Sequence, residues 1–118
     1  MIPMLHREII LPPENLRVGT AQSSLAARIE EICRREGLGA SLKTTLREHP
    51  GCLHWHWKRG RENGTLEVTH WPQENRVWIS VHENRAAPWT DALAERLATI
   101  LERQLGGEAD RVSAQEKR

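Results

Sequence analysis

The chain has 118 residues, of which 38% are hydrophobic and 28% are charged, and its formal net charge is +1. This length predicts a single domain, and this composition is typical of folded proteins, not of disordered ones. Because acidic and basic residues are interspersed, we expect no long-range field that would draw the chain to nucleic acid or to an anionic membrane.

No feature of the chain predicts export or membrane insertion. Its first twenty residues contain charged side chains and the pair Pro12-Pro13, so they lack the apolar core of a signal peptide. No stretch approaches the roughly 18 uncharged residues of a membrane span. Cys33 and Cys52 form no CxxC pair, which predicts reduced thiols. Together these features predict a cytoplasmic protein without membrane contacts.

The N-terminal third predicts a strand followed by a helix. The strand covers His6–Leu11 and stops at two prolines, which have no amide hydrogen to give to a sheet. The helix is predicted to begin at a cap formed by Ser23 or Ser24 and to end at Gly37. Its apolar face at helical spacing consists of Leu25, Ile29, Ile32 and Cys33.

From Ser41 onward the hydrophobic period changes from about 3.6 to about 2 residues, and turn signals recur at regular intervals. This pattern predicts four antiparallel strands in a meander, at residues 41–48, 52–58, 65–71 and 76–83. A second helix is predicted to begin at Ala87-Pro88 and to end at Gly106-Gly107. The domain therefore spans residues 1–107, and 108–118 are predicted to be a flexible polar tail.

The predicted fold class is α+β, with two helices packed on one face of the four-stranded antiparallel meander and the N-terminal strand in addition. The element order is strand, helix, four strands, helix. In topology this order resembles one repeat of the TATA-box-binding protein fold and its helix-grip relatives. The resemblance implies that the sheet face opposite the helices is the working surface.

The last hairpin predicts which side chains share a face, because its four-residue turn pairs Trp71 with Arg76. The helix-covered face is predicted to hold Leu53, Trp55, Trp57, Leu66, Val68, Val77, Ile79 and Val81. The opposite face is predicted to hold Cys52, His54, His56, Glu67, Thr69, Trp71, Arg76, Trp78, Ser80 and His82. Two indoles among imidazoles predict partial cover of this face by the N-terminal segment, a second subunit or a ligand.

His54-Trp55-His56 resembles the His-hydrophobic-His strand motif of the HUH endonucleases, in which both imidazoles hold a divalent metal beside a tyrosine nucleophile. The chain contains no tyrosine, which excludes that covalent chemistry here. His54 and His56 point the same way along a strand, about 7 Å apart, and Glu67 is predicted beside them. The three residues predict a candidate metal site of two histidines and one carboxylate.

Three functions remain open from the sequence. The leading hypothesis is a non-enzymatic binding or assembly domain whose open face, with Trp71 and Trp78, is buried in a homodimer or on a protein partner. The second is a metal-dependent enzyme that uses His54, His56 and Glu67 to hold a divalent metal. The third is a single-stranded nucleic-acid-binding module, in which the indoles stack on bases beside the basic loop at residues 58–61.

Overall fold

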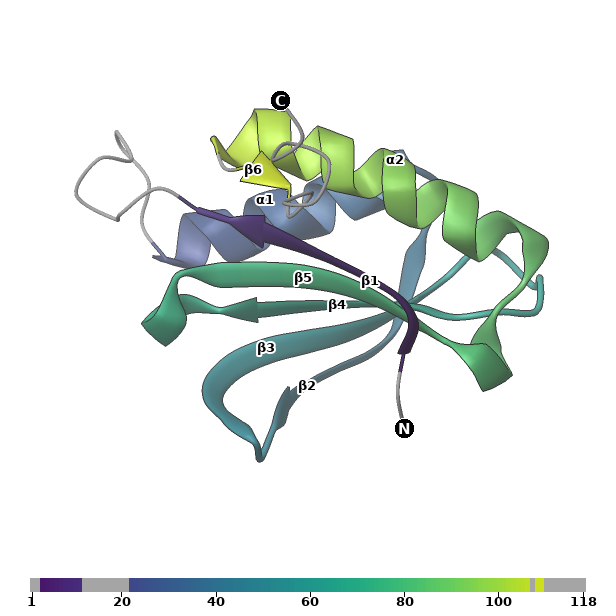
Figure 1. Cartoon of the computed structure of the whole chain (residues 1–118), viewed down its shortest axis with the longest axis horizontal. Helices are drawn as coiled ribbons and strands as arrows, with labels where there is room; N and C mark the ends of the chain where they lie inside the picture. Colours follow the sequence, from purple (N-terminus) through teal and green to yellow (C-terminus); the bar gives the residue numbers. More distant parts are fainter. Residues whose placement is uncertain (1–2, 12–21, 107, 110–118) are drawn as a thin grey trace, which may run out of the picture.

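The computed structural model describes residues 3–11, 22–106 and 108–109, and it shows two helices on one face of an antiparallel sheet (Figure 1). The helices are α1, Gln22–Arg35, and α2, Pro88–Leu105. The strands are β1 (Pro3–Ile10), β2 (Gly39–Leu46), β3 (His49–Lys58), β4 (Leu66–Trp71), β5 (Arg76–His82) and β6 (Glu108–Ala109). The predicted α+β class, with an antiparallel sheet and two helices, is confirmed.

Within the described residues the strands form one sheet in the order β2-β3-β4-β5-β1-β6. The N-terminal strand pairs with β5, which makes β1 the fifth long strand of the sheet. The first two residues of the predicted tail form β6 and pair with Ile9 and Ile10. The rest of that tail, residues 110–118, lies outside the described residues.

The two helices differ in how closely they follow their predicted starts. α1 begins at Gln22, ahead of the predicted start at Ser23 or Ser24, and the side chains of these two serines lie outside the described ones. α2 begins at Pro88 as predicted, and the Thr90 hydroxyl accepts a hydrogen bond from the Ala87 N–H at 3.0 Å.

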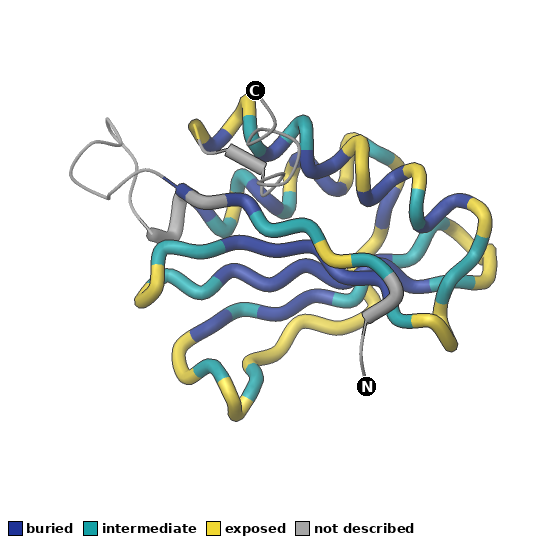
Figure 2. Tube along the Cα trace, in the orientation of Figure 1, coloured by how far each residue is buried: buried dark blue, intermediate teal, exposed yellow. Residues whose placement is uncertain are grey.

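The apolar core lies between the helices and the sheet, and Figure 2 shows the central strands as its most buried part. The predicted register of β4 and β5 is confirmed, with Val68 opposite Ile79 and Trp71 opposite Arg76. Trp55 and Trp57 are fully buried and stack on each other, with their ring centroids 6.4 Å apart. The core also contains Leu25, Ile29, Leu66, Val77, Val81, Leu97 and Leu101. The helices therefore cover one face of the sheet, and polar side chains lie on the other face.

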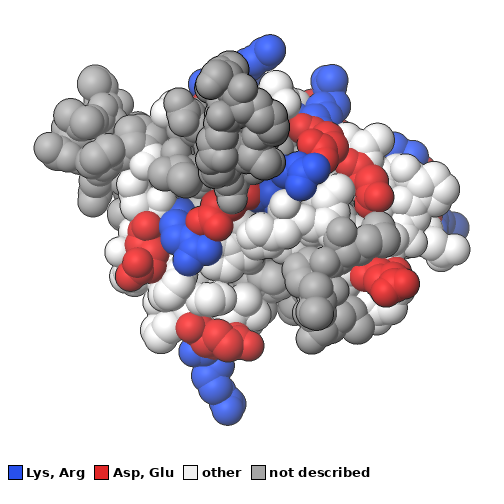
Figure 3. Space-filling view, viewed as in Figure 1, with Lys and Arg blue, Asp and Glu red and all other residues white. Residues whose placement is uncertain are grey.

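Acidic and basic side chains are mixed on the face drawn in Figure 3. Charged side chains also pair between elements: Arg7 of β1 with Glu95 of α2, and Arg96 of α2 with Glu36 at 2.6 Å. No helix in the described part of the chain is both long and apolar enough to cross a bilayer.

Candidate metal centre

The sheet face opposite the helices is hollowed into a cavity of about 420 Å³. Strands β3, β4 and β5 form its floor, β1 contributes one edge, and the β2–β3 hairpin rises at the other. The residues that line it are His6, Leu46, Glu48, His49, His54, Glu67, Thr69, Trp78, Ser80 and His82. The face that the sequence predicts to be open is therefore concave, and six of its predicted residues line this space, whereas His56 lies beside it.

Glu67 of β4 lies at the centre of this face, with only 8% of its side chain exposed. Its Oε1 is 3.3 Å from His54 Nε2 and 3.3 Å from His82 Nε2. Its Oε2 is 3.7 Å from His56 Nε2. Strand pairing produces this arrangement, because Glu67 lies directly opposite His56 on β3 and opposite Ser80 on β5. Three imidazoles thus surround one buried carboxylate.

The spacing of these atoms suits a metal ion. One ligand atom each from His54, His56 and Glu67 lies within 4.8 Å of the other two. Two ligands that are each about 2.1 Å from a tetrahedral ion lie about 3.4 Å apart. His54 Nε2 is 3.3 Å from Glu67 Oε1 and His56 Nε2 is 3.7 Å from Glu67 Oε2, so each imidazole is near that separation from one carboxylate oxygen. The sequence-predicted metal residues are therefore brought together by the fold.

A second contact orients one of the imidazoles. His54 Nδ1 is 2.8 Å from the hydroxyl of Thr69, which is almost completely buried. When Nε2 donates to Glu67, Nδ1 accepts from this hydroxyl; in the opposite tautomer Nδ1 donates to the hydroxyl and the lone pair of Nε2 is free. This is the tautomer that a histidine needs in order to bind a metal through Nε2, and such contacts commonly hold metal-binding histidines in place.

Burial and charge shift the titration of two members of the cluster. Burial lowers the pKa of His56 below its usual 6.5 and outweighs the opposite effect of the Glu67 charge. Burial alone would raise the pKa of Glu67, but the hydrogen bond with His54 and the charges of His56 and His82 outweigh it, so that pKa is lowered from 4.5. An ionised carboxylate beside a neutral imidazole is the state in which both bind metal.

Around Trp71 and Trp78, the predicted open face is covered by other parts of the same chain. The His49 ring lies 4.5 Å from the ring centroid of Trp71 and 5.1 Å from that of Trp78. The Trp71 indole N–H donates to the Pro50 carbonyl at 2.9 Å. Arg76 lies over both indoles, 4.7 Å from the Trp78 centroid, and is held by Glu8 of β1. The cover predicted for the two indoles thus comes from the hairpin tip and from the N-terminal strand.

The remaining predicted residues of this face take other positions. Ser80 lines the cavity, with its hydroxyl oxygen 3.4 Å from His6 Nδ1. Cys52 is completely buried, and its sulfur accepts a hydrogen bond from the Leu46 N–H, so it stands apart from the metal set. Cys33 is buried in the core, where burial raises the pKa of its thiol to about 12.

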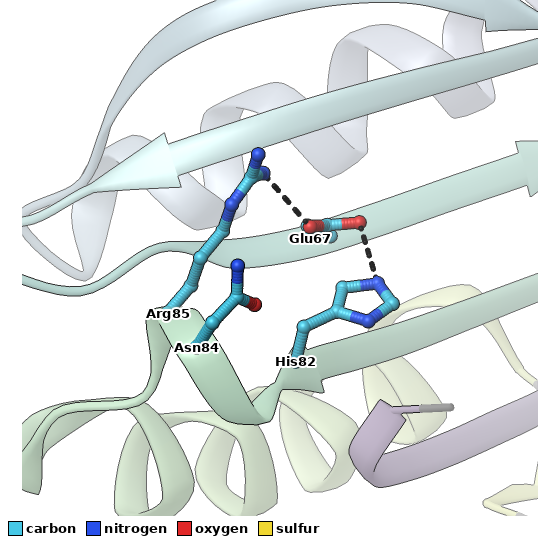
Figure 4. A pocket seen from close by; sticks show the side chains of 4 residues that line it. All are labelled: Glu67, His82, Asn84 and Arg85. Atoms are coloured by element: carbon cyan, nitrogen blue, oxygen red, sulfur yellow. Dashed lines mark hydrogen bonds and ion pairs between the residues drawn. The ribbon is translucent and has the colours of Figure 1, made fainter. Parts of the chain in front are cut away.

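Sequence reasoning missed three residues of the site: His6, His49 and Arg85. His6 had a usable signal, because alternation along β1 places it on the same face as Glu8 once β1 is paired with β5. His49 belongs to a turn signal in the sequence but folds back over the sheet. Arg85 lies in a short turn after β5, and its guanidinium is 3.3 Å from Glu67 Oε2 (Figure 4).

Comparison of the chain with protein-family models, with curated proteins and with solved structures gave no match.

Proposed function

We propose that this chain is a metal-dependent enzyme domain in which His54, His56 and Glu67 hold one divalent ion at the floor of the cavity. The observation that carries this proposal is the convergence of three ligand atoms within 4.8 Å of one another, all from largely buried side chains. Two imidazoles and a carboxylate suit zinc, iron(II), manganese, cobalt and nickel. His82, at 3.3 Å from the same carboxylate, supports Glu67 from the opposite side.

The cavity gives such an ion room to act on a small molecule. An ion with three protein ligands keeps coordination positions open to water or substrate. The adjoining space of about 420 Å³ lies within the range of small-molecule pockets. Glu67, whose pKa is lowered, lines this cavity, and titratable groups with shifted pKa values in cavities are typical of active sites. These features support an enzyme over a purely structural metal site.

The proposal is tested by titrating purified protein with Co²⁺ and Zn²⁺, following the Co²⁺ absorption bands and the heat of binding. The variants are His56→Gln and Glu67→Gln. We expect each to weaken binding more than about 100-fold, because losing a ligand costs more than the 10- to 100-fold typical of residues that orient ligands.

His6→Gln is the matched control, since this histidine lines the same cavity outside the ligand set. We expect it to keep the wild-type affinity, and thermal melts identify any variant that fails to fold. Absence of Co²⁺ and Zn²⁺ binding, or equal affinity in all three variants, would contradict the proposal.

Assembly through protein contacts remains a second candidate, now at a different surface. The indoles that motivated a homodimer or a partner on the open face are covered within the chain. Strand β2, however, is an edge of the sheet, and its residues Gly39 to Thr45 are exposed. An uncovered edge strand favours pairing with another strand, so a homodimer or a protein complex would form here.

Nucleic-acid binding has less support. Three of the chain's basic residues are engaged by carboxylates: Arg59 by Glu62, Arg76 by Glu8, and Lys43 by Glu30. The cytoplasmic location and the topological likeness to a TATA-box-binding protein repeat also stay proposals. The free thiols Cys33 and Cys52 support a cytoplasmic location. The consecutive strand order β2-β3-β4-β5 supports the topological likeness.

A further inference from the structure

Arg85 is the cation of the site, and it lies at a second pocket of about 230 Å³ that adjoins the cavity. Glu67, His82, Asn84 and Arg85 line this pocket (Figure 4). Glu67 and His82 also line the larger cavity, so the two spaces meet at the carboxylate. Any molecule bound beside Glu67 is therefore within reach of the guanidinium.

The backbone of Arg85 is fixed while its guanidinium is half exposed. The Thr65 N–H donates to the Arg85 carbonyl at 2.9 Å, which ties this turn to the start of β4. The turn itself is a single 3-10 element, Glu83–Arg85. The Arg85 side chain is 44% exposed. Its head group can therefore change partner without any change in the sheet.

At present one guanidinium nitrogen serves both Glu67 and His56. Arg85 Nη1 is 3.3 Å from Glu67 Oε2 and 3.3 Å from His56 Nδ1. Because a guanidinium only donates hydrogen bonds, His56 Nδ1 accepts here and the proton of this imidazole is on Nε2. A metal on Nε2 requires the opposite tautomer, with the proton on Nδ1. The ion and Arg85 are therefore alternatives at these two side chains.

A bound ion also changes the charge balance of the site. The negative charge of Glu67 and the positive charge of Arg85 cancel, and the imidazoles are neutral when they bind a metal. A divalent ion adds two positive charges, and Glu48 at the cavity wall returns one negative charge. The loaded site thus has a surplus of about one positive charge beside a displaced guanidinium. An anion with two oxygens in one plane matches both the ion and the fork of an arginine.

We infer that the metal-loaded site binds a small carboxylate, with one oxygen on the ion and the other on Arg85. This inference rests on the proposed metal site and names the class of its ligand. The guanidinium moves from Glu67 to the ligand when the ion arrives, so carboxylate binding depends on the metal.

The test measures Co²⁺ affinity first, and then the affinity of the Co²⁺-loaded protein for acetate, with acetamide as the uncharged probe of the same shape. Wild type, Arg85→Ala and Arg103→Ala are compared, the last being a control at an exposed position of α2. We expect Arg85→Ala to bind Co²⁺ at least as tightly as wild type, because a competing cation is gone. We expect its acetate affinity to fall about 10- to 100-fold, as for the loss of one hydrogen bond between charged groups. Acetamide and metal-free protein should give no binding.

The outcomes separate this inference from the proposed function. If no variant binds Co²⁺, the metal site fails and the inference fails with it. If Co²⁺ binds but acetate has the same affinity in Arg85→Ala and Arg103→Ala, only the inference fails. Weaker Co²⁺ binding by Arg85→Ala would overturn the exchange of partners, since Arg85 would then support the ligands instead of competing with the ion.

Discussion

At the scale of single residues, the cluster around Glu67 combines groups that resist protonation. His56 is held neutral mainly by burial, and Glu67 is held ionised by its imidazole neighbours. Both pKa values lie below those of the unfolded chain. A group whose pKa is lower in the folded state takes up protons more readily when the chain unfolds, so acid favours unfolding.

This predicts how stability depends on pH. The His56 contribution is complete above its unfolded pKa of 6.5 and is lost as the pH falls below that value. The Glu67 contribution is lost only below 4.5. We therefore expect the free energy of unfolding of the metal-free protein in urea to fall between about pH 7.5 and about pH 5.5, and to fall less in His56→Gln.

Asn84→Ala is the control for this measurement, because it changes the same site without removing a titrating group. It should keep the wild-type pH dependence. An equal loss of stability on acidification in His56→Gln and in wild type would contradict the role assigned to this imidazole.

At the scale of elements, the β2–β3 hairpin decides what the second sheet face can do. Its tip folds over the indoles, with His49 against Trp71 and Trp78, and so closes one end of the cavity. The turn is formed by Arg47 and Glu48, and just after it Gly51 of β3 has a φ of +87°, a conformation that favours glycine. A side chain at Gly51 would also meet the amide of Gln73, which would have to move aside.

Gly51→Ala is therefore expected to loosen the hairpin tip. We predict a loss of about 1 kcal/mol or more in unfolding free energy, together with stronger iodide quenching of tryptophan fluorescence as the tip lifts from the indoles. Gly60→Ala is the matched control, because Gly60 also has a positive φ of +57° but open space around it. Equal quenching in the two variants would show that the tip does not depend on Gly51.

At the scale of the whole molecule, the sheet separates an apolar layer from a polar one, and β2 forms its uncovered border. Leu42 of β2 is 43% exposed. The one charged side chain of this strand, Lys43, pairs with Glu30 of α1 at 2.6 Å, so its charge is turned toward the helix. Natural edge strands often carry unpaired charged side chains that block pairing with another strand. β2 has no such side chain, because its lysine is paired with Glu30.

A homodimer through β2 is therefore expected to show concentration-dependent sedimentation in the micromolar range. Leu42→Lys should shift it to monomer, because a lysine on an edge strand disfavours pairing with another strand. Ala92→Lys, which adds the same charge at an exposed position of α2, should leave the dimer intact. A monomer at every concentration of the wild type would remove the dimer hypothesis.

Much of the fold could be predicted from local sequence signals. Pro88 marks the start of α2, and the turn at residues 72–75 set the register that brings Thr69 opposite Trp78. The same alternation placed His54, His56 and Glu67 on one face. These predictions succeed because strand periodicity and turn chemistry act over a few residues.

The rest of the site depends on contacts between segments far apart in the chain. His6 reaches the site because β1 pairs with β5. This pairing brings His6 next to Ser80, although the two residues are 74 positions apart in the chain. His49 reaches the site by the fold of the hairpin tip, and Arg85 by a hydrogen bond to the start of β4. No short-range pattern encodes these approaches.

The sequence by itself thus determined the two faces of the sheet and the three candidate metal ligands, because side chains alternate along paired strands with a period of two. Only the tertiary structure decided that the polar face is concave, that the chain covers its own indoles, and that Arg85 lies beside Glu67. These features arise from sheet curvature and packing, which depend on the whole set of long-range contacts and not on any one segment.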